Sequence, residues 1–134
     1  MANSMAGFFS ALCTAMEAQG YHYAAFDLKG EPSSVIDKAF FIESQLLSCA
    51  DESGGRIMKR RQFDVSFAYV FGPVTDQKTI DTAANTEVEK IEDAIITALK
   101  TDLIELENMR WQHKTTSGYL LAQVSLTATY WRDV

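Results

Sequence analysis

The chain has 134 residues, which fits one domain large enough to fold around its own hydrophobic core. Hydrophobic residues make up 47% and charged residues 22% of it, ordinary for a globular protein, which excludes a disordered or fibrous class. The formal charge of −6 argues against nonspecific nucleic-acid binding, because phosphate affinity depends on clustered lysines and arginines.

The first predicted element is a helix between Ser4, a capping residue, and Gly20, a residue typical of helix ends. This region lacks the basic start of a signal peptide, and no apolar run of the chain is long enough to span a membrane. We therefore expect a protein that is cytoplasmic where it is made. The helix carries one apolar stripe: Phe8, Phe9, Leu12, Cys13 and Met16.

A connection over residues 21–37 leads to a short predicted strand at residues 39–42, where aromatic and β-branched residues gather. Residues 48–55 are expected to form a loop that ends in a turn at Gly54 and Gly55. Large apolar residues then occupy every second position, which predicts a half-buried strand that Gly72 and Pro73 end. Those apolar positions are Phe63, Val65, Phe67, Tyr69 and Phe71.

Residues 74–84 are polar and turn-like, and a helix is predicted over residues 85–100 with Thr86 and Glu89 as its capping box. A strand follows within residues 102–114, and a hairpin turn at residues 115–118 leads into a long alternating strand from Tyr119. These elements predict an α+β fold: a single domain over residues 1–134, with a mainly antiparallel sheet of about four strands and two helices packed on one face.

Catalytic chemistry finds little support in the residue pattern. His22 and His113, the only two histidines, fall in no recognisable motif, and structural roles suit them better than catalysis. Cys13 and Cys49 lack metal-site spacing, so we expect reduced core thiols and no disulfide. We expect no enzyme, no metal and no cofactor. The carboxylates at the predicted start of the second helix are expected to face solvent: Glu87, Glu89, Glu92 and Asp93.

Lys59, Arg60 and Arg61 form the strongest local charge feature, with Arg56 just before them. In a strand, Lys59 and Arg61 share one face and Arg60 takes the other, so the residues suit an exposed strand start, an acidic partner surface or the wall of a nucleic-acid channel. Near the chain end, Trp131 is expected on the Ser and Thr face of the last strand. There, with Arg132, it is a candidate contact.

In size, element order and pattern, most of the chain resembles the tail terminator proteins of long-tailed bacteriophages. The matching segments are the N-terminal helix MAGFFSALCTAMEAQG, the strand QFDVSFAYVFGP, the helix NTEVEKIEDAIITALKTD and the closing strand YLLAQVSLTATYWRD. The resemblance implies a virion protein, assembled in the host cytoplasm, that forms a hexameric ring at the head–tail interface. Such a ring caps the tail tube, stops its growth and docks the head, and DNA passes through its lumen without specific binding.

The resemblance also implies three partners: further copies of the chain, the tail tube protein, and a head-completion or connector protein. A ring needs two unlike surfaces on each subunit. From charge alone, we expect Lys59, Arg60 and Arg61 of one copy to meet Glu87, Glu89 and Glu92 of the next. Two alternatives stay open: another neck or tail-completion connector, and a small-molecule-binding α+β protein or enzyme that uses Cys13, His22 or His113.

Overall fold

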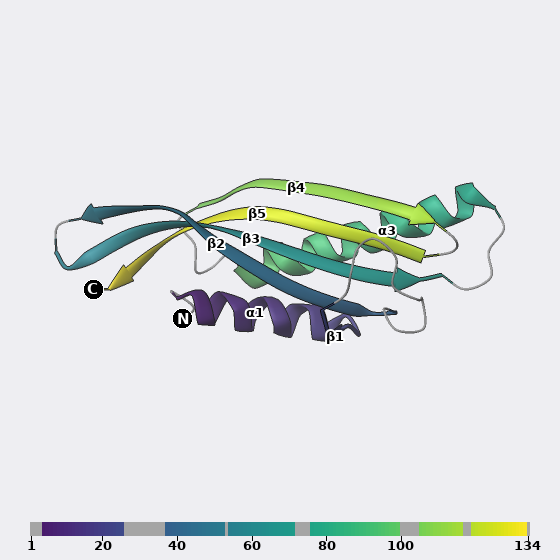
Figure 1. Ribbon diagram of the computed structural model, residues 1–134, viewed down its shortest axis with the longest axis horizontal. Coiled ribbons are helices and arrows are strands. Elements are labelled where there is room, and N and C mark those ends of the chain that lie inside the picture. Colours follow the sequence, from purple (N-terminus) through teal and green to yellow (C-terminus); the bar gives the residue numbers. More distant parts are fainter. Residues whose placement is uncertain are drawn as a thin grey trace.

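The computed structural model describes residues 4–25, 37–52, 54–71, 76–99, 105–116 and 119–133, with the backbone alone for residues 51, 52, 105–116 and 119. Figure 1 shows the two helices, α1 (Met5–Ala18) and α3 (Gln77–Leu99). The strands are β1 (His22–Tyr23), β2 (Ala39–Glu52), β3 (Arg56–Val70), β4 (Glu105–Thr116) and β5 (Tyr119–Asp133). The predicted α+β fold is confirmed.

The strands form one sheet in the order β1, β2, β3, β5, β4. Among the described strands, only the short β1 runs parallel to its neighbour, and every other pair is antiparallel. The turn between β2 and β3 contains Gly54 and Gly55, with φ of 90° and 77°, and glycine adopts these angles without strain. That predicted turn is confirmed. The loop expected at residues 48–52 is wrong, because β2 stays paired with β3 as far as Glu52.

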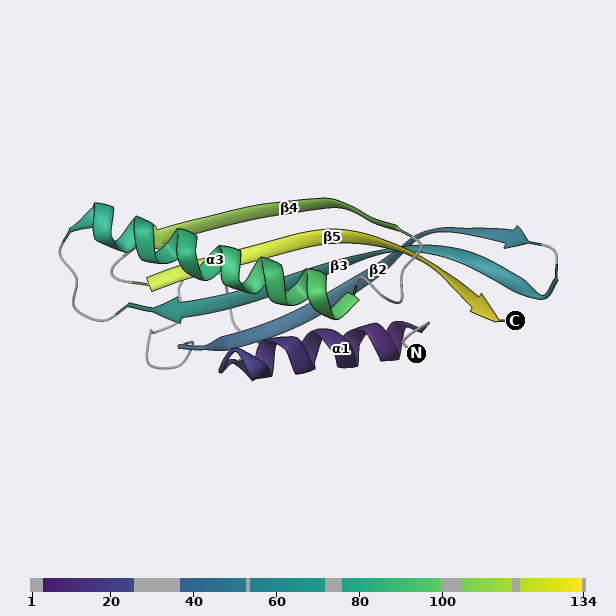
Figure 2. The ribbon, with the colours of Figure 1, turned by 180° about the vertical axis from the view of Figure 1, so that it is seen from behind.

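Both helices cover the same face of the sheet, as Figure 2 shows from the helix side. The register aligns the inward-facing residues of β3 and β5, such as Phe63 with Leu126 and Val65 with Val124. The ring of Phe8 lies edge-on against Tyr130, with centroids 4.8 Å apart, and ties α1 to this layer. The core therefore sits between one sheet face and the two helices. Its largest fully buried side chains are Tyr130, Phe8, Phe40, Phe63, Phe67, Leu12, Met16, Ile91, Ile95, Leu99 and Leu120.

The first helix begins and ends as its sequence predicts. The Ser4 hydroxyl accepts a hydrogen bond from the Gly7 N–H at 3.0 Å, which satisfies a backbone donor at the helix start. At the other end, Gly20 has a φ of 90°, and the N–H groups of Gly20 and Tyr21 bond back to Glu17 and Met16. This pairing closes the last turn and aims Tyr21 toward the core.

The second helix starts earlier than predicted. Residues 77–84, expected to be turn-like, form the first two turns of α3 because Ile80 and Ala84 already bury against the core. The expected capping box at Thr86 is wrong, since its hydroxyl donates to the Thr82 carbonyl inside the helix at 3.0 Å. Asp76 holds the helix start instead, and its carboxylate accepts from the Thr79 hydroxyl at 2.7 Å.

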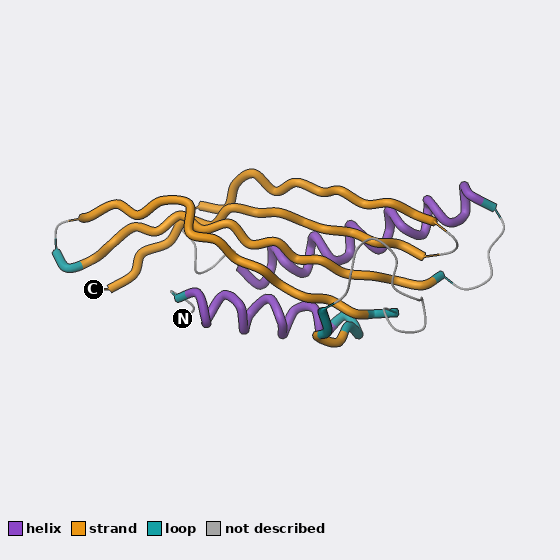
Figure 3. The backbone as a smooth tube through the Cα atoms, in the orientation of Figure 1, coloured by secondary structure: helices purple, strands orange, loops and turns teal. Residues whose placement is uncertain are grey.

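Three strands continue beyond the helices as an arm. Figure 3 shows β2, β3 and β5 running past the start of α1, where the strands bend. A register shift between Leu46 and Ser48 marks this bend, because a bulge adds one residue to β2 and increases its twist. We define the arm as residues 48–52, 56–60 and 129–133, which pair with one another across the three strands.

The last strand is buried on both faces and not only on one. Leu120, Val124 and Leu126 face the helices as the alternation predicts. On the opposite face, however, Thr127 and Thr129 are also buried, with 5% and 8% of their surface exposed. β5 lies between β3 and β4, so its small side chains are covered by longer ones on the neighbouring strand. Thr129, for example, pairs with Arg60 of β3.

Candidate functional site

The basic arm

The basic segment of the sequence lies on the arm and at its base. The register confirms that Lys59 and Arg61 share the helix-side face and that Arg60 takes the opposite face. All three side chains are half-buried, so they are less solvated than the charge pattern suggests. The Arg61 Nε donates to the Tyr130 hydroxyl at 3.3 Å, which fixes the base of the arm to the core.

The arm also holds the candidate aromatic contact. Trp131 lies half-buried on the Ser and Thr face, as expected, and its ring lies 4.5 Å from the Arg56 guanidinium. A cation stacked on an aromatic face in this way is attracted to the ring, which orders both side chains at the arm surface. Arg132 is exposed on the next position of the same strand. The arm thus presents ordered basic and aromatic groups beyond the helices.

Charge is unevenly distributed along the chain. Residues 54–62 contain four basic side chains and no acidic one. The rest of the sequence then has eight basic against 18 acidic side chains, a formal charge of −10. The whole arm holds four basic residues, Arg56, Lys59, Arg60 and Arg132, and three acidic residues, Asp51, Glu52 and Asp133, so its positive charge is concentrated on β3 and the helix-covered body carries the acidic excess.

The acidic helix

Glu87 is not a solvent-facing residue at a helix start, and that expectation is wrong. It lies in the middle of α3 on the buried stripe, with 7% of its surface exposed. Its carboxylate accepts a hydrogen bond from the Tyr21 hydroxyl at 2.6 Å and lies 3.2 Å from the Lys90 ammonium. A buried carboxylate needs such partners, so Glu87 serves the core and not a partner surface.

The other two candidate carboxylates remain accessible on α3. Glu89 is exposed and Glu92 is half-buried, and neither is near the helix start. The structure therefore keeps these two on the body surface and removes Glu87 from the set. In a single copy the arm and the body of α3 are separate regions along the long axis of the molecule (Figure 1).

Tyr21 is the centre of a cluster that the sequence did not indicate. Burial, followed by the hydrogen bond to Glu87, raises the pKa of the Tyr21 hydroxyl above its usual range. The Lys38 ammonium lies 5.0 Å from the Tyr21 ring and 4.5 Å from the Tyr69 ring. The burial of Glu87 could have been predicted from the 3.6-residue period of a helix, because that period places Glu87 on the same stripe as Ala84 and Ile91.

Hollows and thiols

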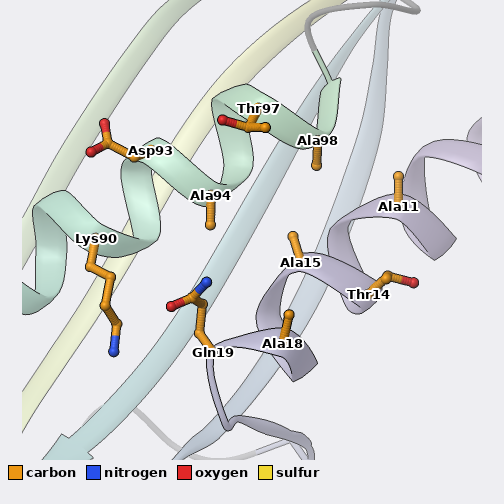
Figure 4. Close-up of a pocket in the computed structure, with 10 residues that line it drawn as sticks. All are labelled: Ala11, Thr14, Ala15, Ala18, Gln19, Lys90, Asp93, Ala94, Thr97 and Ala98. Atoms are coloured by element: carbon orange, nitrogen blue, oxygen red, sulfur yellow. The ribbon is translucent and has the colours of Figure 1, made fainter.

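An open groove of about 660 Å³ runs between the two helices (Figure 4). Ala11 and Ala15 on α1 and Ala94 and Ala98 on α3 line it with methyl groups. Lys90, one of its few charged residues, is already paired with Glu87. The groove therefore offers small apolar walls and few converging polar groups.

The described residues that were considered for catalysis lie on different elements. Cys13 packs half-buried on α1, where burial and then Glu17 raise its thiol pKa, which disfavours the reactive thiolate. His22 is exposed on β1, and it does not belong to the described lining of the helix groove. Cys49, expected in the core, is exposed on the arm because β2 has no helix over it there. The side chain of His113 lies outside the described residues.

Among the residues whose side chains are described, five large apolar ones are exposed along the β2 side of the molecule, and we call them the β2 border. They are Met5, Phe9, Tyr23, Leu46 and Leu47. The rings of Phe9 and Tyr23 meet edge-on, with centroids 5.7 Å apart, and the Met5 sulfur lies 3.4 Å from the Ser44 hydroxyl. Grouped apolar side chains of this kind mark contact surfaces more often than scattered ones do.

Across the described ranges, no three His, Cys, Asp or Glu side chains gather as a metal ion requires. No helix in the described part of the chain combines the length and apolar character needed to cross a membrane. Neither a protein-family model nor a curated protein matches this chain.

Proposed function

We propose that the protein is a structural virion subunit that acts as a tail terminator. In this role, six copies form a ring that caps the tail tube, stops its growth and provides the docking surface for the head. The subunit works at the head–tail interface of the virion after assembly in the host cytoplasm. It needs no catalytic group and no cofactor.

The observation that carries the proposal is the arm. Three strands leave the helix-covered core, and one of them, β3, carries Arg56, Lys59 and Arg60, whereas the helix-covered body is strongly acidic. A ring is built from heterologous contacts, in which one surface meets a different surface of the next copy. The basic residues of β3 on the arm and the acidic surface of α3 supply two such surfaces, with Glu89 and Glu92 as the acidic candidates.

The acidic balance also suits a ring that DNA must cross. Phosphates bind clustered cations, so a lumen with few uncompensated cations lets DNA pass without holding it. The contacts expected beyond the ring are the end of the tail tube on one side and a head-completion or connector protein on the other.

The test is the mass of the purified protein by light scattering over a wide concentration range, with electron micrographs of the same samples and of samples mixed with purified tail tubes. We expect sixfold rings, either free or on tube ends. Twelvefold rings that bind the portal side of the head would instead indicate a connector. A strict monomer that binds no tube, or a small molecule retained through purification, would contradict the proposal.

A further inference from the structure

Within the described ranges, the outer edge of β2 is open over most of its length. β1 pairs only with Ala39 and Phe40, and the Tyr23 hydroxyl lies 3.4 Å from both the nitrogen and the oxygen of Ile42. Since the backbone groups of alternate residues point to the same edge, Ser44 and Leu46 present their N–H and C=O groups outward as Ile42 does. No described strand pairs with that edge beyond Phe40.

The open edge is bordered by apolar side chains. The β2 border lies on this side of the molecule, and Leu46 itself is 45% exposed on the edge strand. Soluble proteins usually protect such an edge with charges, prolines or a covering segment. Unpaired backbone groups beside apolar side chains are the features that allow an added strand to bind.

The opposite edge of the same sheet matches in direction and length. The four long strands alternate in direction, so β4 at the far edge runs antiparallel to β2. A second copy in the same orientation therefore brings its β2 antiparallel to the β4 of the first. The two strands have 14 and 12 residues, so they are comparable in length.

We propose that β2 of one copy pairs with β4 of the next and extends one continuous sheet around the ring. This inference rests on the proposed function and names the contact that closes it. The contact joins two unlike edges, as a ring requires, and it leaves the helices of every copy on the same side of the sheet. The open part of β2 lies toward the arm, whereas β4 reaches the other end of the sheet, so neighbours are staggered as in closed barrels.

Thiol cross-linking tests the contact, because Cys49 is exposed on the open half of β2. One variant carries Cys13→Ala and keeps Cys49 as its only thiol. A second variant carries Cys13→Ala and Cys49→Ser, with a single cysteine placed in turn at Trp111, His113 or Thr115 of β4. Each variant alone and each mixture is treated with a short bismaleimide at ring-forming concentration, and the mass of every sample is measured.

We expect cross-linked pairs in at least one mixture and in neither variant alone. A Cys49 variant that cross-links with itself would show that two β2 edges meet, which overturns the inference. Rings without any cross-link in the mixtures would overturn the edge pairing and leave the proposed function standing. Monomers in every sample, with tail tubes present, would overturn both.

Discussion

The Tyr21 hydroxyl lies 2.6 Å from the Glu87 carboxylate, which joins the turn that follows α1 to the middle of α3. The two residues are 66 positions apart in the sequence, and both are buried. Since Tyr21 also packs edge-on against Phe67 of the sheet, with centroids 5.5 Å apart, this one residue connects both helices to the strand layer.

Replacing Tyr21 by phenylalanine is expected to destabilise the fold by about 1–3 kcal/mol, because a buried carboxylate loses its hydrogen-bond donor. Urea unfolding measures the change. Tyr23→Phe is the matched control, since Tyr23 is 48% exposed and its hydroxyl contacts are 3.4 Å long. An equal loss of unfolding free energy in the two variants would show that the Tyr21–Glu87 hydrogen bond adds no more stability than the exposed Tyr23 hydroxyl does.

The same pair makes stability fall at high pH. Because the folded pKa of Tyr21 is raised above the unfolded value near 10, its contribution is complete below pH 10 and declines as the pH rises further. The slope is about 1.4 kcal/mol per pH unit, since the unfolded chain releases a proton that the folded chain retains. Urea unfolding between about pH 9 and pH 11 should show this extra loss in the parent chain and not in Tyr21→Phe. If the free energy of unfolding fell equally with pH in the parent chain and in Tyr21→Phe, the raised pKa of Tyr21 would not be the cause.

Asp76→Ala is expected to lower the unfolding midpoint, because α3 loses the side chain that bonds to Thr79 at its start. The hydrogen bond from the Thr79 side chain lowers the pKa of Asp76, so the contribution is present at neutral pH and lost as the pH falls through that lowered value. Thr86→Ala is the control, and its helix-interior position predicts little change or a small gain. A larger drop in the unfolding midpoint for Thr86→Ala than for Asp76→Ala would instead support the helix start predicted from the sequence, at residue 85.

Charge reversal tests the contact between arm and body. Lys59→Glu should weaken self-association and remove much of its salt dependence, and Glu89→Lys in the same chain should restore it in part. Light scattering at low and moderate salt reports the mass. Lys78→Glu, on the exposed first turn of α3, serves as the control for net charge. The pairing would be refuted if the double variant associated no better than Lys59→Glu.

Ser44→Pro should abolish ring formation and leave the fold intact. Proline removes the Ser44 N–H, which points to the open edge and not to β3, so the internal pairing of β2 remains. Ser44→Ala keeps that N–H and loses the same contact with Met5, which makes it a matched control. Circular dichroism confirms folding, and light scattering reports the mass. Rings formed by a folded Ser44→Pro chain would exclude this edge from the contact.

The sequence predicted the elements whose ends are set by nearby capping residues or whose buried face is set by a regular apolar pattern. Ser4 and Gly20 bracket α1, and alternation identified β3 and β5. The first turns of α3 were missed because most of their residues are polar and face solvent, with only Ile80 and Ala84 buried. The length of β2 was missed for a related reason, since from Glu43 to Ala50 its side chains are exposed and pairing with β3 maintains the strand.

In the candidate site, too, the sequence predicted what depends on neighbouring residues and missed what depends on distant ones. Strand alternation placed Lys59 and Arg61 opposite Arg60, and the structure confirms it. The burial of Glu87 depends on Tyr21, a partner distant in sequence, so a local reading assigned it to the surface. The open edges of β2 and β4 follow from the strand order, and no short stretch of sequence encodes that order.

The order β2, β3, β5, β4 has a consequence for the nascent chain. β5 completes the middle of the sheet but follows the other four described strands in sequence, so β3 lacks one neighbour until all of them have been synthesised. Until then a hairpin with two unpaired edges and exposed apolar side chains must avoid other chains, since such intermediates aggregate readily. The charged residues on both strands of the hairpin, four basic and four acidic over residues 39–70, disfavour apolar association of the unfinished protein during that interval.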